Sequence, residues 1–112
     1  MGSNKYLLTP DKIKDLVPQM GYCYASDTIT VDGMKVGYMY REIRDDNDDS
    51  GWRFLSGTET EEYVEDQTNS MFFEVNVIAN YDPAIIPYLK MKVGTEWERV
   101  EGTDTFQQIV QE

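Results

Sequence analysis

Acidic side chains are the residues of this sequence whose type and spacing could do chemistry. The 112 residues contain 21 Asp and Glu against 10 Lys and Arg, so the formal net charge is −11. Residues 42–66 hold ten acids and two bases, a local net charge of −8. Clustered carboxylates can transfer protons or bind cations, and they can also attract a basic protein surface.

Two acidic runs in this segment form a candidate docking surface. They flank residues 51–57, a strand-like segment bounded by glycines, so we expect them to emerge near each other. Such a surface could dock a basic partner protein and speed association by electrostatic steering. The same pattern is typical of a solvated loop and helix face that maintain solubility. The candidate residues are Asp45, Asp46, Asp48, Asp49, Glu59, Glu61 and Glu62.

Catalytic and metal chemistry have little support in the sequence. No histidine is present, which excludes Ser-His-Asp and Cys-His mechanisms within this chain. The residues from Asp46 to Gly51 match the opening of a calcium loop, but its twelfth position, which needs a Glu, is Gly57. Cys23 sits in an apolar segment and is interpreted as a buried, unreactive thiol. We expect no enzyme activity, no catalytic residues, no metal and no cofactor.

The charge and the single cysteine also bear on partner class and location. A charge of −11 disfavours nucleic acid and anionic membranes, since both attract basic surfaces. The sequence contains no apolar run of the roughly 18 to 20 residues needed to span a bilayer, and its first residues lack a hydrophobic signal core. One cysteine suits a reducing compartment. We therefore expect a cytoplasmic protein, whose oligomeric state the sequence leaves open.

Aromatic residues suggest a second type of site. Tyr38, Tyr40, Trp52 and Tyr81 could line a concave pocket for a small molecule or peptide. Trp52 is also interpreted as a core residue beside an outward Arg53 that offsets neighbouring acids. A pocket would favour a housekeeping binding domain over a docking protein.

The elements that must position these residues belong to an α+β fold. The Thr9-Pro10-Asp11 signature and apolar residues at helical spacing predict an N-terminal helix over 9–20. A mostly antiparallel β-sheet follows, with hairpins and short connecting helices. Expected strands are 22–25, 28–31 and 35–41 as a hairpin around Asp32-Gly33, 51–57, 71–80, and a final hairpin of 95–100 with 105–109; short helices are expected at 58–66 and from Asp82.

Several motifs in order carry a resemblance to a known family. They are VDGMKVGYMYRE at 31–42, DSGWRFLSG at 49–57, Asn76, ANYDP at 79–83, IIPYL at 85–89 and WER at 97–99. Together they resemble a small bacterial family of domains of unknown function, relatives of which are placed among the immunity proteins of polymorphic toxin systems. The resemblance covers roughly residues 22–106 and leaves the predicted N-terminal helix outside.

The resemblance implies a small, acidic, non-enzymatic bacterial protein and transfers no catalytic residues. We expect a single domain over residues 1–112, with residues 1–8 flexible. The first hypothesis is an immunity-like protein that docks a basic partner protein, such as a toxin, through its acidic surface. The alternative is a housekeeping domain that binds a small molecule or peptide in the aromatic pocket. A carboxylate hydrolase is a third and weaker hypothesis, because 21 acids make some close pair inevitable.

Overall fold

One sheet of six strands organises the computed structural model, which describes residues 5–110. The strands are β1 (Tyr22–Ser26), β2 (Tyr38–Arg41), β3 (Asp49–Leu55), β4 (Ser70–Glu74), β5 (Glu96–Arg99) and β6 (Phe106–Ile109). Short helices connect them: α1 (Asp27–Thr30), α2 (Glu61–Glu65) and α3 (Val75–Tyr81), with the 3-10 turns η1 (Pro10–Lys12), η2 (Gln67–Asn69) and η3 (Pro83–Tyr88). The expected α+β class is confirmed.

The strands follow the spatial order β4-β1-β3-β2-β5-β6. Four of the five strand pairings are antiparallel, and the pairing of β1 with β3 is parallel. The prediction of a mostly antiparallel sheet therefore holds for four pairings, and the one parallel pairing makes the sheet mixed. A parallel pair needs a long connection, and here α1, β2 and the acidic loop 42–48 supply it.

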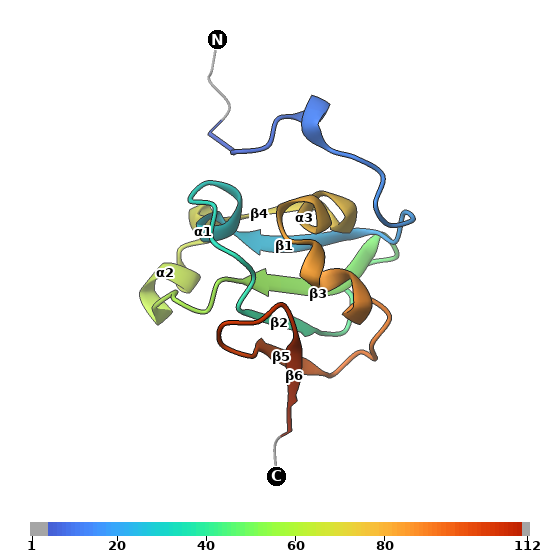
Figure 1. Ribbon diagram of the computed structural model, residues 1–112, viewed down its shortest axis with the longest axis vertical. Coiled ribbons are helices and arrows are strands. Elements are labelled where there is room, and N and C mark those ends of the chain that lie inside the picture. The colour runs from blue at the N-terminus through green and yellow to red at the C-terminus, as the bar shows by residue number, and fades with distance from the viewer. Residues whose placement is uncertain (1–4, 111–112) are drawn as a thin grey trace.

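α3 and η3 lie over one face of the sheet, which we call the helix face, in front of the strands in Figure 1. Alternate strand residues point toward this face and form the core. Trp52 and Phe54 of β3 stack with ring centroids 5.8 Å apart, and the Trp52 indole donates to the Leu89 carbonyl at 3.0 Å. The interpretation of Trp52 as a core residue is confirmed. The opposite face, the open face, carries the intervening residues.

The predicted N-terminal helix over 9–20 is largely wrong, since helical structure stops after η1. The backbone N–H groups of this segment donate hydrogen bonds to side chains of α3 rather than to carbonyls of a preceding helical turn. The Lys14 N–H donates to the Asn80 side chain at 2.9 Å. The N–H groups of Leu16 and Val17 both donate to the Asn76 side chain. Pro18 also lacks the N–H that a continuing helix needs, so tertiary contacts outweigh the apolar spacing.

The predicted hairpin around Asp32-Gly33 is wrong as well, because residues 27–30 form α1. The Ser26 hydroxyl accepts a hydrogen bond from the Thr28 N–H and caps this helix. Gly33, with a φ of +81°, donates to the Ile29 carbonyl and turns the chain after the helix. A local cap thus overrides the strand preference of a β-branched run.

The predicted strand over 71–80 is confirmed in its first half only. It ends at Glu74, and α3 follows with Val75, Ile78 and Ala79 buried at helical spacing. Further along, Asp82 caps η3 by accepting from the Ala84 N–H, as the Asp82-Pro83 pattern predicted. The final hairpin also forms, as β5 paired with β6.

Within residues 5–110, no helix is long and apolar enough to cross a membrane. Of the segment 1–8 expected to be flexible, residues 1–4 lie outside the described part of the chain. Leu7 and Leu8 are hydrogen-bonded, their N–H groups donating to the Thr30 carbonyl and the Tyr81 hydroxyl. The N-terminal segment is thereby fastened to α1 and α3.

The buried face of α3 gives a direct test of this packing. Ile78→Ala should lower the free energy of unfolding by about 2–5 kcal/mol, because the methyl groups removed leave a cavity in a fully buried site. Ile43→Ala is the matched control, since Ile43 is 80% exposed, and it should change stability by less than about 0.5 kcal/mol. Urea unfolding measures both variants, and equal effects would contradict the packing described.

Candidate functional site

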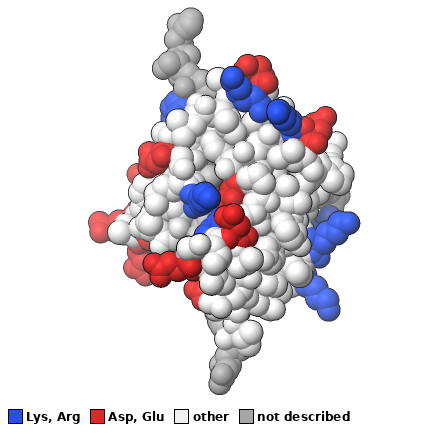
Figure 2. Space-filling model, viewed as in Figure 1, with Lys and Arg blue, Asp and Glu red and all other residues white. Residues whose placement is uncertain are grey.

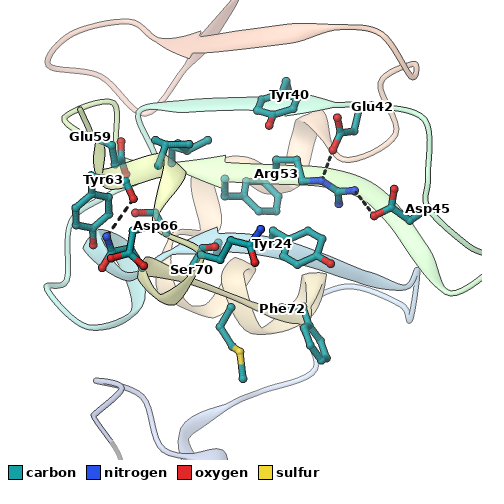
Figure 3. Close-up of a pocket in the computed structure, with 18 residues that line it drawn as sticks. Tyr24, Tyr40, Glu42, Asp45, Arg53, Glu59, Tyr63, Asp66, Ser70 and Phe72 are labelled. Carbon is teal, nitrogen blue, oxygen red and sulfur yellow. Dashed lines mark hydrogen bonds and ion pairs between the residues drawn. The ribbon is translucent and has the colours of Figure 1, made fainter. Parts of the chain in front are cut away.

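The open face is hollowed beside its central strands, and this open-face hollow has a volume of about 580 Å³. Its floor is formed by Tyr24 of β1, Arg53 of β3 and Tyr40 of β2. Figure 3 shows these side chains on the side of the sheet away from α3. A smaller hollow of about 460 Å³ adjoins it and shares Leu55, Glu59 and Val64 with it.

Arg53 stands at the centre of the floor, and its charge is fully engaged by the protein. Its guanidinium donates to both carboxylate oxygens of Asp49, at 3.0 and 2.8 Å, and to Glu42 at 2.6 Å. One face of the guanidinium lies 4.7 Å from the centre of the Tyr24 ring. Burial alone would lower the pKa of Arg53, but its hydrogen bonds to Asp49 and Glu42 raise it. Arg53 therefore neutralises acids of the floor and its side chain is only 6% exposed.

Asp49, a predicted docking residue, lies inside the protein, with a side chain that is 0% exposed. Besides Arg53, it accepts hydrogen bonds from the N–H groups of Asp45 and Gly51. Hydrogen bonding to Arg53 lowers the pKa of the Asp49 carboxyl to about 2, although burial opposes the shift. Asp49 thus anchors the acidic loop to β3 and is enclosed by the fold.

Glu59 is likewise committed to internal contacts. Its carboxylate accepts from the Thr28 hydroxyl at 2.7 Å, from the Ser56 N–H at 2.9 Å and from the Gly57 N–H at 2.9 Å. Burial raises the pKa of Glu59, but these hydrogen bonds outweigh it and lower the pKa to about 2. Glu59 joins the turn before α2 to α1, and α2 itself begins after Thr60, whose side chain accepts from the Tyr63 N–H.

The remaining predicted acids are all exposed, and of these five only Asp45 lines the hollow. Asp45, with a side chain 66% exposed, lines one end together with Glu42. Asp46 and Asp48 follow in the same loop. Glu61 and Glu62 are exposed on α2, the helix whose Tyr63 and Val64 line the hollow. Figure 3 places Glu42 and Asp45 on one side of Arg53 and Glu59 and Asp66 on the other, so acids line the hollow at both ends.

The charge distribution over the molecule is uneven. Figure 2, viewed from the helix side, shows acidic side chains crowded along the margin where Figure 1 places α2. Basic side chains stand on the opposite margin, where the segment between η3 and β5 runs and where Lys90 and Lys92 are exposed. A basic partner approaching this molecule is therefore drawn toward the α2 end.

Aromatic side chains extend the floor of the hollow to the sheet edge. Tyr24 packs against Tyr22 and Phe72, with ring centroids 5.9 and 6.3 Å apart. The Tyr22 hydroxyl donates to the Asp46 carboxylate at 2.9 Å, and burial together with this hydrogen bond raises the pKa of Tyr22 to about 12. Phe72 is 57% exposed at the edge strand β4. The hollow thus combines an aromatic surface with acidic ends.

The predicted aromatic pocket is not assembled as one site. Tyr40 lines the open-face hollow and Tyr38 lines the smaller one. Trp52 is buried on the helix face, and Tyr81 lies on α3, where its hydroxyl accepts from the Leu8 N–H. Alternation along β2 and β3 separates the tyrosines from the tryptophan, because Trp52 is paired with Arg41 rather than with either tyrosine.

Among residues 5–110, no cluster of three or more acidic, Cys or His side chains has an arrangement that could hold a metal ion. In the loop that resembles the start of a calcium site, Asp46 accepts from the Tyr22 hydroxyl and from the Asp48 N–H. Cys23 is fully buried, and burial raises the pKa of its thiol. Asp46 therefore holds the loop in place through hydrogen bonds, and Cys23 is part of the buried core.

The sequence matches one protein-family model, that of the Imm33 immunity protein domain, over residues 23–110. The chain belongs to the Imm33 family. Searches of curated proteins and of solved structures found no significant match. The matched segment begins at the second residue of β1 and includes the other five strands and the residues that line both hollows. The N-terminal segment that packs against α3 precedes it. The resemblance expected from the sequence motifs is confirmed.

Sequence reasoning did not select four residues that shape the hollow in this Imm33 protein: Tyr24, Glu42, Tyr63 and Phe72. For Tyr24 a signal exists, since Tyr22 and Tyr24 alternate with the apolar Cys23 and Ala25 and so share one strand face. For Tyr63 no comparable signal exists, because α2 buries no residue. Tyr63 is placed by the turn before α2, which the hydrogen bonds of Glu59 stabilise.

The ion pairs of Arg53 should be essential for stability. Arg53→Met leaves the buried Asp49 carboxylate without its partner, and the free energy of unfolding should fall by about 3–5 kcal/mol. Arg44→Met is the control, because Arg44 is exposed in the acidic loop and should change stability by under about 0.5 kcal/mol. Denaturant unfolding at pH 7 measures both, and a stable Arg53→Met protein would contradict this role.

The lowered pKa values of Asp49 and Glu59 predict acid sensitivity. Each carboxylate stabilises the folded state above its unfolded pKa, and that stabilisation is lost as the pH falls toward about 2. The free energy of unfolding should therefore decline between about pH 5 and pH 2. Glu59→Gln should be less stable at pH 7 and show a shallower decline, while Glu62→Gln, altered at an exposed position, should follow the unmodified protein.

Proposed function

We propose that this Imm33 protein is a non-enzymatic immunity protein that binds a toxin in the cytoplasm and blocks it by docking through the open face. The observation that carries the proposal is that exposed acids line both ends of one hollow, Glu42 and Asp45 at one end and Asp66 at the other. Membership of an immunity protein family supports a toxin as the partner.

Electrostatics favours a basic partner surface. The acids lining the hollow are Glu42, Asp45, Glu59 and Asp66, and its one basic lining residue, Arg53, is already neutralised by Asp49 and Glu42. The field at the mouth of the hollow is thus negative. Complementary charge raises association rates by steering the encounter, which suits a protein that must capture a toxin quickly.

Apolar surface gives the contact its second component. Phe72 and Val64 are each more than half exposed and face the hollow from the two sides of its mouth. Partly exposed tyrosines form much of the floor between them. Interfaces commonly combine an aromatic centre with a charged rim, and the open-face hollow has that composition.

The alternative of a housekeeping domain with a small-molecule pocket has weaker support. Its four candidate residues, Tyr38, Tyr40, Trp52 and Tyr81, are divided between two hollows, the core and the helix face. The hollow that does exist is wide and acidic-ended, which suits a protein surface better than an enclosed small ligand.

A kinetic experiment tests the docking hypothesis. The protein serves as bait in the bacterium that encodes it, and a captured toxin is identified and produced in inactivated form. Replacing Asp45, Asp46 and Asp48 together by Asn should slow its association several-fold at low salt, with a smaller effect at high salt, because these exposed charges steer the encounter. Stopped-flow or surface plasmon resonance measures the rates.

The matched control replaces Asp15, Asp32 and Glu101 by Asn or Gln, because these three acids are exposed and lie outside the acidic loop 42–48 that carries Asp45 into the lining of the hollow. It removes the same charge and should change the rate much less. Equal slowing by both triple variants, or unchanged kinetics in the first, would contradict docking through the acidic ends of the hollow.

A further inference from the structure

The outer edge of β4 is an unpaired sheet edge beside the open-face hollow. β4 is the first strand in the sheet order, and no other strand of residues 5–110 pairs with its outer side. Such an edge presents backbone N–H and C=O groups that a second chain can bind. Natural sheets often protect their edges with Lys, Pro or a bulge, but residues 70–74 contain neither Lys nor Pro and pair with β1 in unbroken register.

The register identifies which backbone groups point outward. In an antiparallel pair, residues that exchange hydrogen bonds alternate with residues that do not. The Val75 N–H donates to the Gly21 carbonyl at 3.2 Å, so Phe73 and Met71 continue the hydrogen-bonded series toward β1. The N–H and C=O of Phe72 consequently point away from the sheet.

Phe72 also offers its side chain. It lies opposite Tyr24 on the open face, 57% exposed, with its ring centroid 5.7 Å from that of Tyr22 and 6.3 Å from that of Tyr24. One residue therefore presents both free backbone groups and an aromatic surface at the mouth of the hollow.

The acidic side chains around the β4 edge favour a positively charged binding partner. Glu74 is exposed on β4, Asp66 is exposed at the lining of the hollow, and Asp46 holds the Tyr22 hydroxyl. Arg53, the basic residue of the hollow, is engaged by Asp49 and Glu42 and does not offset these acids. A cation placed over an aromatic ring beside carboxylates gains from both interactions.

We propose that an extended segment of the partner protein pairs with the outer edge of β4 as a seventh strand and carries Arg or Lys at alternate positions. The alternate cationic side chains lie over Phe72 and reach toward Asp46 and Asp66. Backbone pairing supplies binding energy, and the alternating side chains supply selectivity. This inference rests on the proposed function for the identity of the partner, but it names a contact that the docking hypothesis does not require.

A second copy of the chain fits this edge less well, because each copy carries a net charge of −11 and would bring the same acids together. The other sheet edge, β6, is also a weaker candidate. Its exposed residues Gln107 and Gln108 present amides rather than an aromatic ring, and neither hollow is lined by β6.

The first experiment uses a synthetic ten-residue peptide alternating Arg and Thr, with both ends blocked, and a matched peptide alternating Glu and Thr. NMR titration of the full chain should show at least tenfold tighter binding of the Arg peptide. Amide hydrogen exchange at Phe72 should slow several-fold on binding. Absence of Arg-peptide binding, or binding that leaves exchange along β4 unchanged, overturns the proposal.

A pair of variants separates the backbone contact from the side chain. Phe72→Ala removes the ring and keeps the outward N–H, whereas Phe72→Pro removes both, at an edge position where Pro is tolerated. Binding of the Arg peptide should weaken at least tenfold more in Phe72→Pro than in Phe72→Ala, with circular dichroism confirming that both fold. Equal weakening overturns strand addition.

A modified peptide provides the same test without altering the protein. Arg-Thr peptides N-methylated at odd or at even positions should differ at least tenfold in affinity, because only one set of N–H groups faces β4. Equal affinities overturn the proposal, as does a dimer in analytical ultracentrifugation that Phe72→Pro abolishes. Toxin association slowed by the aspartate triple variant, together with failure of these peptide tests, would retain the docking function and reject the seventh strand.

Discussion

The buried ion pair between Arg53 and Asp49 is the constraint on which the open face depends. It lies on β3, which is enclosed between β1 and β2. Two charges in such a place are tolerable only when their hydrogen-bonding groups are satisfied. That requirement draws in Glu42 and the backbone N–H of Asp45, and so fixes the path of the acidic loop.

Gly51 makes this arrangement possible. Its φ of +86° lies in the left-handed region, and a Cβ on it would meet the Glu42 carbonyl oxygen at 2.4 Å. Its N–H donates to Asp49, so the DSG motif brings the carboxylate, the turn and the loop together. The same residues that hold the interior therefore present Asp45, Asp46 and Asp48 to solvent.

Local patterns predicted the elements that local interactions decide. The strand around Trp52, the cap at Asp82 and the final hairpin all formed as expected. The predictions failed where residues distant in the sequence make the deciding contacts. Asn76 and Asn80 accept hydrogen bonds from the backbone of residues 14–17, and β1 pairs in parallel with β3. Neither partner is visible within a short window of sequence.

Contacts with distant residues also separate the candidate acids into buried and exposed ones. Composition located a charged segment, and the structure separates its members by what they contact. Asp49 and Glu59 accept hydrogen bonds inside the protein, while Asp45, Asp46, Asp48, Glu61 and Glu62 remain exposed. No spacing rule distinguishes an acid that holds an arginine from its neighbour one residue away. The local charge of −8 therefore overstates what a partner can meet.

The strand order also determines when this protein becomes competent during synthesis. Of the six strands, β1 is the first to leave the ribosome, yet both its neighbours, β3 and β4, come later in the chain. Its pairing must wait until residues up to Glu74 are available, and such long-range pairing is intrinsically slow. The hollow, which needs β1, β2, β3 and β4 together, cannot form before the residues up to Glu74 have been made. Formation of the open-face hollow therefore follows translation with a delay, which sheet closure sets.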